Sequence, residues 1–345
     1  MTDSPRTPGK VAPLPAGERP TLKTISRLTG LAVATVSRAL HDAPDIGSDT
    51  KRRVQETADR IGYRPNRAGV RLRTGKTNVI SLVLSTDHDM MNHTARLISS
   101  LAGELRGTPY HMIVTPYFPS EDPMLPVRYI VESGSADAVI LNQTEPEDPR
   151  VAYLMRRNFP FATHGRTKWC ADHAYYDFDN TRFAEVGIEE LARRGRQSVL
   201  MVAPPARQNY GRNMIEGAQR RAHDLGIACT VLPEANSDSA SAEIEAAFAD
   251  YFAEHPETDA VLCGSTTATM AVVARAEDMG QTIGEDLDVF AKEAIPFLQR
   301  FRRAILTVHE DVATAGGFLA RAAIRRIEDP AKPPMQGLES PKFEL

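Results

Sequence analysis

The chain has 345 residues, of which 42% are hydrophobic and 25% are charged, and this composition is typical of a water-soluble globular protein with about two domains. No run of about 18 apolar residues is present, and the first 20 residues lack the apolar stretch of a secretory signal, so neither a membrane span nor export is expected. The three cysteines lie far apart without a Cys-x-x-Cys pair, which argues against a disulfide framework or a zinc site and fits the cytoplasm.

The net charge of −4 hides an uneven distribution along the chain. Residues 1–19 contain four prolines and two glycines and are expected to form a disordered tail. Residues 20–76 contain twelve Lys and Arg against five Asp and Glu, whereas the residues that follow are acidic overall. A basic segment attached to an acidic body is typical of a protein that binds a polyanion, so contact with nucleic acid is expected to be confined to the N-terminal part.

Three short helices are predicted after the tail. The first is capped by Thr21 and ends before Gly30, the second covers residues 33–40, and the third covers about 48–61. Two helices joined by a tight glycine-containing turn, with a third helix packed across them, are typical of a helix-turn-helix. The pattern therefore predicts a helix-turn-helix DNA-binding domain at residues 20–65.

The segment at 66–76 is basic, contains two glycines and has few apolar residues, so it is expected to be a hinge or linker. From residue 77 to residue 345, apolar runs alternate with amphipathic segments. The expected strands lie at about 79–84, 110–115, 138–141, 161–163, 198–202, 229–232, 260–263 and 287–290, with helices between them and a last helix at about 310–327. This alternation predicts parallel sheets covered by helices on both faces, in two α/β lobes with a ligand cleft between them.

Three motifs resemble those of the lactose-repressor (LacI) family of transcription regulators. They are Ala34-Thr35-Val36-Ser37-Arg38, Ile61-Gly62-Tyr63-Arg64-Pro65-Asn66 and Leu72-Arg73-Thr74-Gly75. The resemblance is strongest up to about residue 80 and looser beyond it. It implies an α+β multi-domain fold, in which a small all-α helix-turn-helix domain precedes a two-lobed α/β domain like that of periplasmic sugar-binding proteins.

The resemblance also implies which residues contact DNA. Val33, Ala34 and Arg38 occupy the positions that read bases in that family. Arg38 can donate two hydrogen bonds to a guanine edge, whereas Val33 and Ala34 either make apolar contacts, for example to a thymine methyl, or simply fill the helix. Three hydroxyl side chains suit phosphate oxygens, although the last of them can instead bond to its own helix: Thr21, Thr35 and Ser37.

Residues 66–72 match the segment that, in the family, folds into a short helix on the operator and enters the minor groove. Asn66 begins this segment. Leu72 stands where the family places an apolar wedge that kinks DNA, unless it packs between the hinge and the body. Gly69 stands where the family usually has alanine. Because glycine costs a helix about 1 kcal/mol relative to alanine, this hinge is expected to depend even more on DNA in order to fold.

The body resembles the family's effector domain, and five effector-binding candidates follow from that resemblance: Arg166, Asp179, Arg212, Ser265 and Lys292. Arg166 follows a predicted strand end, where clefts of α/β proteins open, and it is either a cleft donor or part of a surface ion pair. The family's ligand-binding arginine position is taken by Met214. Lys292 replaces a ligand-binding aspartate, so it either binds an anionic or hydroxyl-rich ligand or forms a salt bridge with a cleft carboxylate.

Other classes of function fit the sequence less well. It contains no dinucleotide-binding, P-loop, zinc-protease or hydrolase motif, and its nine histidines show no metal spacing, so no enzyme activity, cofactor or metal is expected. The basic N-terminal segment argues against a periplasmic sugar binder. We therefore predict a homodimeric regulator, a repressor as is usual in the family, which binds pseudo-palindromic double-stranded operator DNA and a small-molecule effector, with a sugar implied by the resemblance. Induction or corepression, and control by a protein partner or a non-sugar ligand, stay open at this point.

Overall fold

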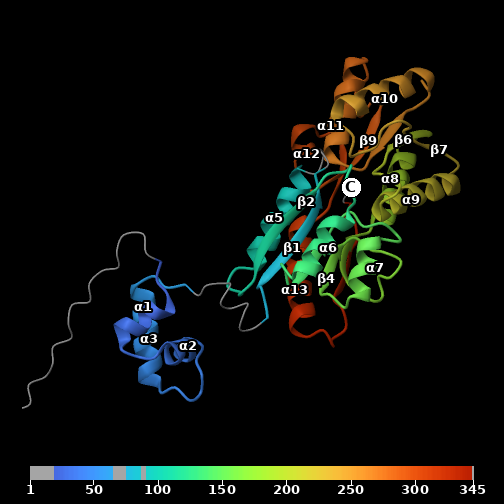
Figure 1. The fold of residues 1–345 in the computed structure, drawn as a ribbon. Helices are drawn as coiled ribbons and strands as arrows, with labels where there is room; N and C mark the ends of the chain where they lie inside the picture. The colour runs from blue at the N-terminus through green and yellow to red at the C-terminus, as the bar shows by residue number, and fades with distance from the viewer. Residues whose placement is uncertain (1–18, 65–74, 87–90, 344–345) are drawn as a thin grey trace, which may run out of the picture. The chain divides into compact units, whose positions relative to one another are not determined.

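The computed structural model describes residues 19–64, 75–86 and 91–343, and the chain separates into two units, Met1–Thr77 and Asn78–Leu345 (Figure 1). The expected tail and the expected hinge lie almost wholly outside the described residues. Within the described ranges, no helix is both long and apolar enough to cross a membrane.

The N-terminal unit contains three helices within residues 19–64: α1 (Leu22–Thr29), α2 (Val33–Leu40) and α3 (Ser48–Arg60). Thr21 caps α1 as predicted, because its hydroxyl oxygen accepts a hydrogen bond of 3.2 Å from the amide of Thr24. Gly30 ends α1 with a φ of +70°, which glycine adopts without strain, and the chain then enters α2. Five buried side chains form the core between the helices: Ile25, Val36, Ala39, Val54 and Ala58. The predicted helix-turn-helix is confirmed.

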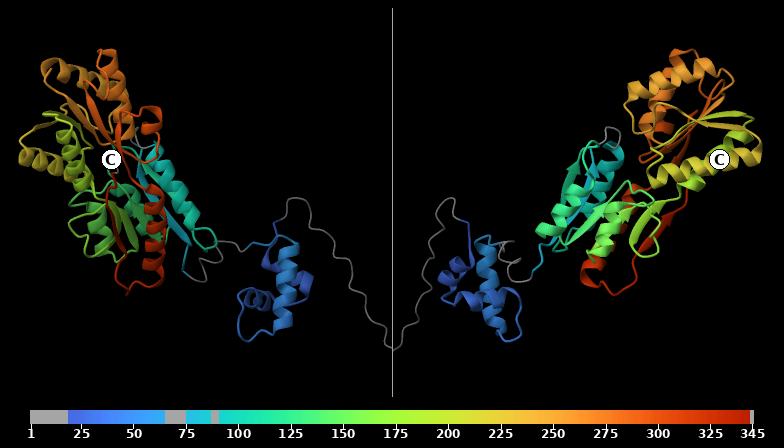
Figure 2. Two further views of the ribbon diagram at one scale, coloured as in Figure 1. Left: turned by 180° about the vertical axis from the view of Figure 1, so that it is seen from behind. Right: turned by 45° about the vertical axis from the view of Figure 1, so that its right-hand side comes forward.

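The C-terminal unit is built on two parallel sheets, which define lobe A and lobe B (Figures 1 and 2). Among the described residues, lobe A has six strands in the spatial order β11 (Gln336–Glu339), β5 (Ala174–Phe178), β4 (Phe161–His164), β3 (Ala138–Leu141), β1 (Val79–Ser85) and β2 (His111–Tyr117). One face of this sheet is covered by α5 (Met91–Glu104) and α13 (Val312–Glu328), and the other by α6 (Met124–Ser133) and α7 (Pro149–Arg156).

Lobe B has five strands in the part of the chain that the structure describes, in the order β10 (Leu306–His309), β9 (Asp288–Glu293), β8 (Ala260–Cys263), β6 (Ser198–Val202) and β7 (Ala228–Val231). One face is covered by α8 (Asn180–Arg193) and α9 (Asn209–Leu225), and the other by α10 (Ser241–Glu254), α11 (Thr266–Asp278) and the short α12 (Leu298–Phe301). The predicted two-lobed α/β architecture is confirmed.

The central strand β6 shows why its sequence is apolar throughout. Successive side chains of a strand point to opposite faces, and here both faces are buried. Val199 and Met201 pack against α8 and α9, whereas Leu200 and Val202 pack against α10 and α11. A strand sandwiched in this way has no solvent side on which a polar residue would be favoured.

Within residues 91–343, the chain passes between the two lobes at three places. β5 leads directly into α8, β10 leads into α13, and after β11 the ring of Phe343 packs on that of Phe290 in lobe B, with centroids 5.2 Å apart. The crossings are bonded to one another, because the amide of Asp179 donates to the carbonyl of Glu339 at 2.8 Å and the amide of Asp311 donates to the Glu339 carboxylate at 3.1 Å. Short connections of this kind allow two lobes to close on a ligand by a hinge motion.

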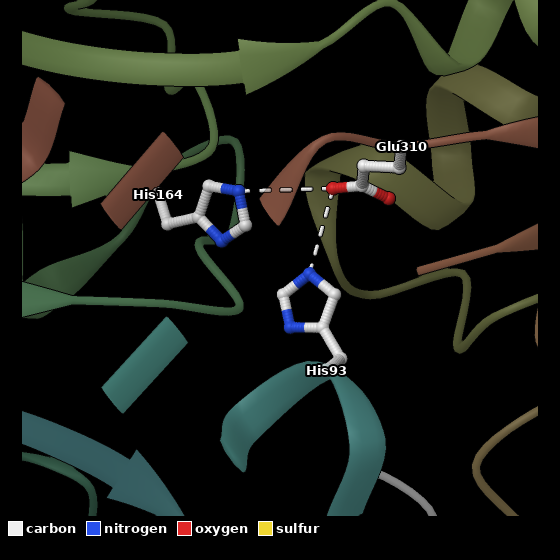
Figure 3. Close-up of side chains that lie close together, drawn as sticks. All are labelled: His93, His164 and Glu310. Carbon is white, nitrogen blue, oxygen red and sulfur yellow. Dashed lines mark hydrogen bonds and ion pairs between the residues drawn. The ribbon is translucent and has the colours of Figure 1, made fainter. Parts of the chain in front are cut away.

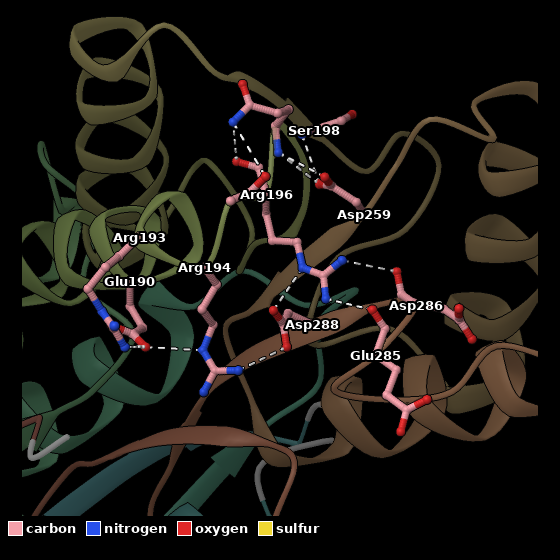
Figure 4. A network of polar contacts seen from close by, with 11 residues as sticks. Glu190, Arg193, Arg194, Arg196, Ser198, Asp259, Glu285, Asp286 and Asp288 are labelled. Atoms are coloured by element: carbon pink, nitrogen blue, oxygen red, sulfur yellow. Dashed lines mark hydrogen bonds and ion pairs between the residues drawn. The ribbon is translucent and has the colours of Figure 1, made fainter.

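Ion pairs and hydrogen bonds occupy the edge of the lobe B sheet where β6, β8 and β9 begin (Figure 4). Asp288 is buried at the start of β9 and accepts from Arg196 at 2.8 Å and from Arg194 at 3.4 Å. Asp259 accepts from the backbone amides of Gln197 and Ser198. Structural contacts thus take up the amino ends of these strands, which leaves the carboxyl ends for a ligand, as is usual in parallel α/β sheets.

Candidate functional site

One face of α2 is left exposed by the packing of the N-terminal unit. Val36 is buried in the core between the three helices, whereas Val33, Ala34 and Arg38 are exposed. The three predicted base-reading residues therefore lie on the outer side of one helix, in its first and second turns. The guanidinium of Arg38 forms an ion pair with Asp45. Because exposed ion pairs contribute at most about 1 kcal/mol, a DNA base can displace the Asp45 carboxylate.

The residues predicted to contact phosphates lie on α2 and at the start of α1. Thr35 and Ser37 are half-buried on α2, and Thr21 is exposed at the start of α1, where its hydroxyl also caps the helix. The three hinge residues that the sequence singles out fall outside the described residues: Asn66, Gly69 and Leu72.

A cavity lies between lobe A and lobe B, beside the carboxyl ends of strands from both sheets. It encloses about 880 Å³, including space that is open to solvent. Lobe A contributes His93, His164 and Asp177 to its wall, and lobe B contributes Ser265 and Lys292. Its other polar side chains are Asn142, Gln143, Asn180, Tyr210, Ser237, Asp238, Thr266, Thr267 and Glu310. Amides, hydroxyls and charged groups on opposite walls fit a small ligand with several polar groups that contacts both lobes.

Lys292 and Glu310 form the charged centre of this cavity. Nζ of Lys292 lies 2.8 Å from Oε2 of Glu310 and donates a hydrogen bond of 3.0 Å to Oδ1 of Asn180. It also lies 5.3 Å from the centre of the Phe178 ring and 5.7 Å from that of Tyr210. Burial raises the pKa of Glu310, but Lys292 and two nearby histidines outweigh it and hold that pKa well below its usual value. Of the two options that the sequence leaves for Lys292, the salt bridge with a cleft carboxylate is therefore present.

Two imidazole rings stand beside the other oxygen of Glu310 (Figure 3). The Nε2 atoms of His93 and His164 lie 3.5 Å and 3.7 Å from Oε1 of Glu310, and the two rings stack with their centroids 5.1 Å apart. Burial and the neighbouring His93 lower the pKa of His164 to about 3, against the opposing attraction of Glu310, so His164 is neutral at pH 7. One carboxylate is thus shared between an ammonium and two imidazoles.

Arg166 forms an ion pair behind the cavity wall and is not one of the residues that line the cavity in the described structure. Its Nε donates a hydrogen bond of 2.7 Å to Oδ2 of Asp177, which does line the cavity. Burial raises the pKa of Asp177 more than the charge of Arg166 lowers it. Arg166 therefore holds a cavity carboxylate in place, so that its contribution to a ligand is indirect.

Asp179 and Arg212 are likewise not among the described residues that line the cavity. The Asp179 carboxylate caps α8 by accepting a hydrogen bond of 3.1 Å from the amide of Arg182. Arg212 lies on α9 and pairs with Glu216 at 2.8 Å, and both side chains are more than half exposed. The geometry therefore gives these two candidates roles in their own helices.

Ser265 lines the cavity and at the same time begins α11. Its Oγ accepts a hydrogen bond of 3.1 Å from the amide of Ala268 and donates one of 3.2 Å to the carbonyl of Ser237. Ser265 and Lys292 are thus the two sequence candidates that the structure brings together at the cavity.

Sequence reasoning missed the histidines and Glu310. His164 ends β4 and Glu310 directly follows β10, so both stand at the strand ends where clefts open, which is the same signal that pointed to Arg166. His93 lies in the first turn of α5 and has no such signal. Its contribution depends on the packing of α5 on α13, which brings residues 217 positions apart into contact.

Comparisons with known proteins identify both units. The family described as "Bacterial regulatory proteins, lacI family" matches residues 21–66, and the "Periplasmic binding protein-like domain" matches residues 188–344. The HTH-type transcriptional regulator AglR of Rhizobium meliloti (strain 1021) is 29% identical over 333 residues, which cover 92% of this chain and 90% of AglR.

Two solved structures share the fold. The lac repressor dimer bound to operator and the anti-inducer ONPF has a TM-score of 0.82 at 15% identity, with coverage of 95% of this chain and 98% of that one. The complex of the transcriptional regulator CelR with cellobiose has a TM-score of 0.69 at 20% identity, with coverage of 95% and 99%. The matched proteins are transcription regulators, in agreement with the expectation that this chain is not an enzyme. The chain carries a lacI-family helix-turn-helix followed by a periplasmic binding protein-like domain, and its homologues are LacI-family transcription regulators.

Proposed function

We propose that the chain is a repressor whose affinity for its operator is controlled by a sugar or sugar derivative bound between the lobes. The observation that carries this proposal is a polar cavity whose walls come from both lobes and lie beside the crossings between them. A ligand that contacts both walls stabilises a closed arrangement relative to an open one. It can change operator affinity only through this difference in its affinity for the two arrangements.

The chemistry of the cavity supports a ligand that carries hydroxyl groups. Oδ1 of Asn142 is buried and has no hydrogen-bond partner among the described residues. A buried acceptor left unpaired costs about 1–3 kcal/mol, which a ligand hydroxyl that donates to it would recover. The solved structure of CelR, which has the same fold, is a complex with cellobiose.

The proposed DNA contacts come from the outer face of α2 and from the hinge. Arg38 reads a guanine, Val33 and Ala34 contact a thymine methyl, and the hydroxyls of Thr21, Thr35 and Ser37 bind phosphates. In the hinge, the segment that contains Asn66, Gly69 and Leu72 folds on the operator, and Leu72 inserts into the minor groove.

A homodimer is part of the same proposal, because two-fold symmetry in the protein matches a pseudo-palindromic operator. Its support in this chain is a group of exposed large apolar side chains on the edge strand β2, on α6 and on the segment between them: Ile113, Val114, Phe118, Leu125 and Tyr129. Large apolar side chains exposed on an edge strand and on the helix beside it are typical of protein interfaces. The lac repressor structure with which this chain shares its fold is a dimer.

The test is operator binding by the full-length protein at fixed salt. DNA from upstream of its own gene and of neighbouring genes is titrated with and without a panel of sugars and sugar phosphates. We expect one site to bind with a Kd of about 10⁻⁸–10⁻¹¹ M and one compound to change that Kd at least about tenfold, with the direction distinguishing induction from corepression. Weak, salt-sensitive binding that is equal for all sequences would contradict a specific repressor. If the protein bound one site specifically and no compound in the panel changed its Kd, the effector would be a non-sugar ligand or a protein partner instead of a sugar.

A further inference from the structure

We propose that His93, His164 and Glu310 bind a divalent transition-metal ion in the cavity, with Zn²⁺ the best match to the donor atoms. All three side chains line the cavity, and one candidate donor atom from each lies within 4.8 Å of the other two (Figure 3). Two imidazole nitrogens and one carboxylate oxygen form a donor set that zinc takes in open sites, where three protein ligands leave a further position for water or a bound molecule.

The distances favour a shared ion over direct hydrogen bonds. The separations of 3.5 Å and 3.7 Å between the imidazole Nε2 atoms and Oε1 of Glu310 exceed the 2.7–3.2 Å usual for a good hydrogen bond. Two atoms that each lie about 2.0–2.1 Å from one tetrahedral ion are about 3.3–3.4 Å apart. The two separations from Glu310 are therefore close to that of two ligands on the same metal, and the donor atoms of the two histidines lie within 4.8 Å of each other.

The three ligands come from separate elements that converge at one edge of lobe A. His164 ends β4, His93 lies in the first turn of α5, and Glu310 occupies the crossing from β10 to α13. The side chains of His164 and Glu310 are 9% and 6% exposed, so their positions are set by packing before any ion arrives. An ion held by all three would tie a crossing between the lobes to the body of lobe A.

Lys292 uses the second oxygen of the same carboxylate. Its Nζ pairs with Oε2, whereas the imidazoles face Oε1, so one Glu310 carboxylate can serve the ammonium and an ion together. Because Lys292 already neutralises Glu310, a bound dication leaves local positive charge. This charge favours an anionic or oxygen-rich fourth ligand from the cavity, toward which the open position faces. The metal site stands on these side chains alone and does not depend on the proposed response to a sugar.

The test uses Co²⁺ as a spectroscopic probe for Zn²⁺ on the full-length protein without DNA, so that it is independent of any regulatory result. We expect one Co²⁺ per chain with the intense visible absorption of a four- or five-coordinate site, and its displacement by Zn²⁺. His93→Gln and His164→Gln should each weaken binding at least about tenfold, since even the loss of a group that only supports a ligand costs 10–100-fold. His223→Gln is the matched control, because His223 is 91% exposed on α9.

Thermal unfolding separates loss of a ligand from loss of the fold. Zn²⁺ should raise the Tm of the wild type and of His223→Gln but not that of the two cavity variants, whose metal-free Tm values should stay close to that of the wild type. The proposal is overturned if the wild type takes up no Co²⁺ in a low-coordinate site. It is also overturned if the cavity variants bind as tightly as the wild type, or if His223→Gln loses binding to the same extent as they do.

Discussion

Among the exposed residues of α2 that we propose to read bases, Arg38 alone carries side-chain hydrogen-bond donors, since Val33 and Ala34 are apolar. Its side chain is 55% exposed and paired with Asp45, a contact weak enough for DNA to replace. Arg38→Ala should therefore reduce the discrimination between operator and random DNA by about 1–3 kcal/mol. The measurement is the ratio of the two Kd values by fluorescence anisotropy at one salt concentration.

Arg52→Ala provides the matched control for this change. Arg52 lies on α3, is 70% exposed and pairs with Asp49, so its removal takes away one positive charge without touching the outer face of α2. It should weaken binding to operator and random DNA by similar factors, because a cation near phosphates contributes without regard to sequence. If Arg38→Ala behaved in the same way, base reading would have to be assigned to another residue.

A buried ion pair below the cavity makes a second prediction at the residue scale. Arg150 is 3% exposed, its Nη2 lies 2.7 Å from Oδ2 of Asp148, and the same nitrogen donates to the carbonyls of Asn142 and Gln143 at 3.2 Å and 3.0 Å. Because those two residues line the cavity, the pair positions part of its wall. Burial raises the pKa of Asp148, but the hydrogen bonds and charge of Arg150 outweigh it and hold that pKa below its usual value.

Asp148→Asn should lower the free energy of unfolding by about 3–5 kcal/mol, because it leaves the Arg150 guanidinium buried without a counter-charge. The folded pKa of Asp148 lies below its unfolded value, so the contribution of the pair is fully present above the unfolded pKa and is lost as pH falls through the folded pKa. Urea unfolding of wild type and variant from pH 7 downward should show a constant difference that shrinks only at acidic pH below about 4. A difference that stays unchanged as the pH falls well below about 4 would contradict the pairing.

At the scale of elements, the contact between α5 and α13 depends on one of two adjacent glycines. A Cβ on Gly316 would overlap Oγ of Ser100 and lie 3.1 Å from the amide nitrogen of Leu101. A Cβ on Gly317 would meet only the carboxylate end of Glu104 at 3.2 Å and the tip of Arg321 at 3.4 Å, and these flexible ends can move aside. Both glycines lie within α13, so they differ in their surroundings and not in their secondary structure.

Gly316→Ala should therefore destabilise the C-terminal unit by about 1–3 kcal/mol, because it forces α5 and α13 apart. Gly317→Ala should be neutral or stabilise it by up to about 1 kcal/mol, which is the helix preference for alanine over glycine. The measurement is the free energy of unfolding of the two variants and of the wild type in urea. Equal effects of the two substitutions would show that the close approach of the two helices does not control stability.

The elements that the sequence predicted well are those with one dominant pattern. β6, β3 and β8 match their predicted bounds, because a strand buried on both faces is a short continuous apolar run. β5, β10 and β11 were missed. β5 and β11 carry Asp177 and Glu339, which belong to the cavity and the crossings, so polar residues there obscure the strand pattern.

The candidate site was less predictable than the fold, for a related reason. Resemblance placed Lys292 and Ser265 at the cavity, but it could not show that Lys292 pairs with Glu310 across a lobe crossing. Strand-end reasoning selected the neighbourhood of β4 correctly and then favoured Arg166 over His164. Only the three-dimensional packing shows that Arg166 forms an ion pair with Asp177, whereas His164 lines the cavity.

At the scale of the whole molecule, the proposed function uses two copies of the chain, because one helix-turn-helix reads only half of a two-fold operator. Lobe A exposes large apolar side chains on β2, on α6 and between them, including Ile113 at 48% exposure and Tyr129 at 67%, and a separate one, Leu338, on β11. Lobe B also exposes single large apolar side chains, such as Leu225 at 40% and Met270 at 45%. These lie on α9 and α11, outside the proposed interface, and therefore provide a control of similar exposure.

The double variant Ile113→Lys with Tyr129→Lys should shift the protein from dimer to monomer, because an unpaired ammonium buried in an interface costs several kcal/mol. We expect the dimer Kd to rise at least about a hundredfold by sedimentation equilibrium, with a parallel loss of operator affinity while binding to a single half-site persists. The control double variant Leu225→Lys with Met270→Lys adds the same charge to lobe B and should leave both quantities unchanged. If the two double variants remained equally dimeric, the interface would lie on another face, and if both became monomeric, the added charge itself would be the cause.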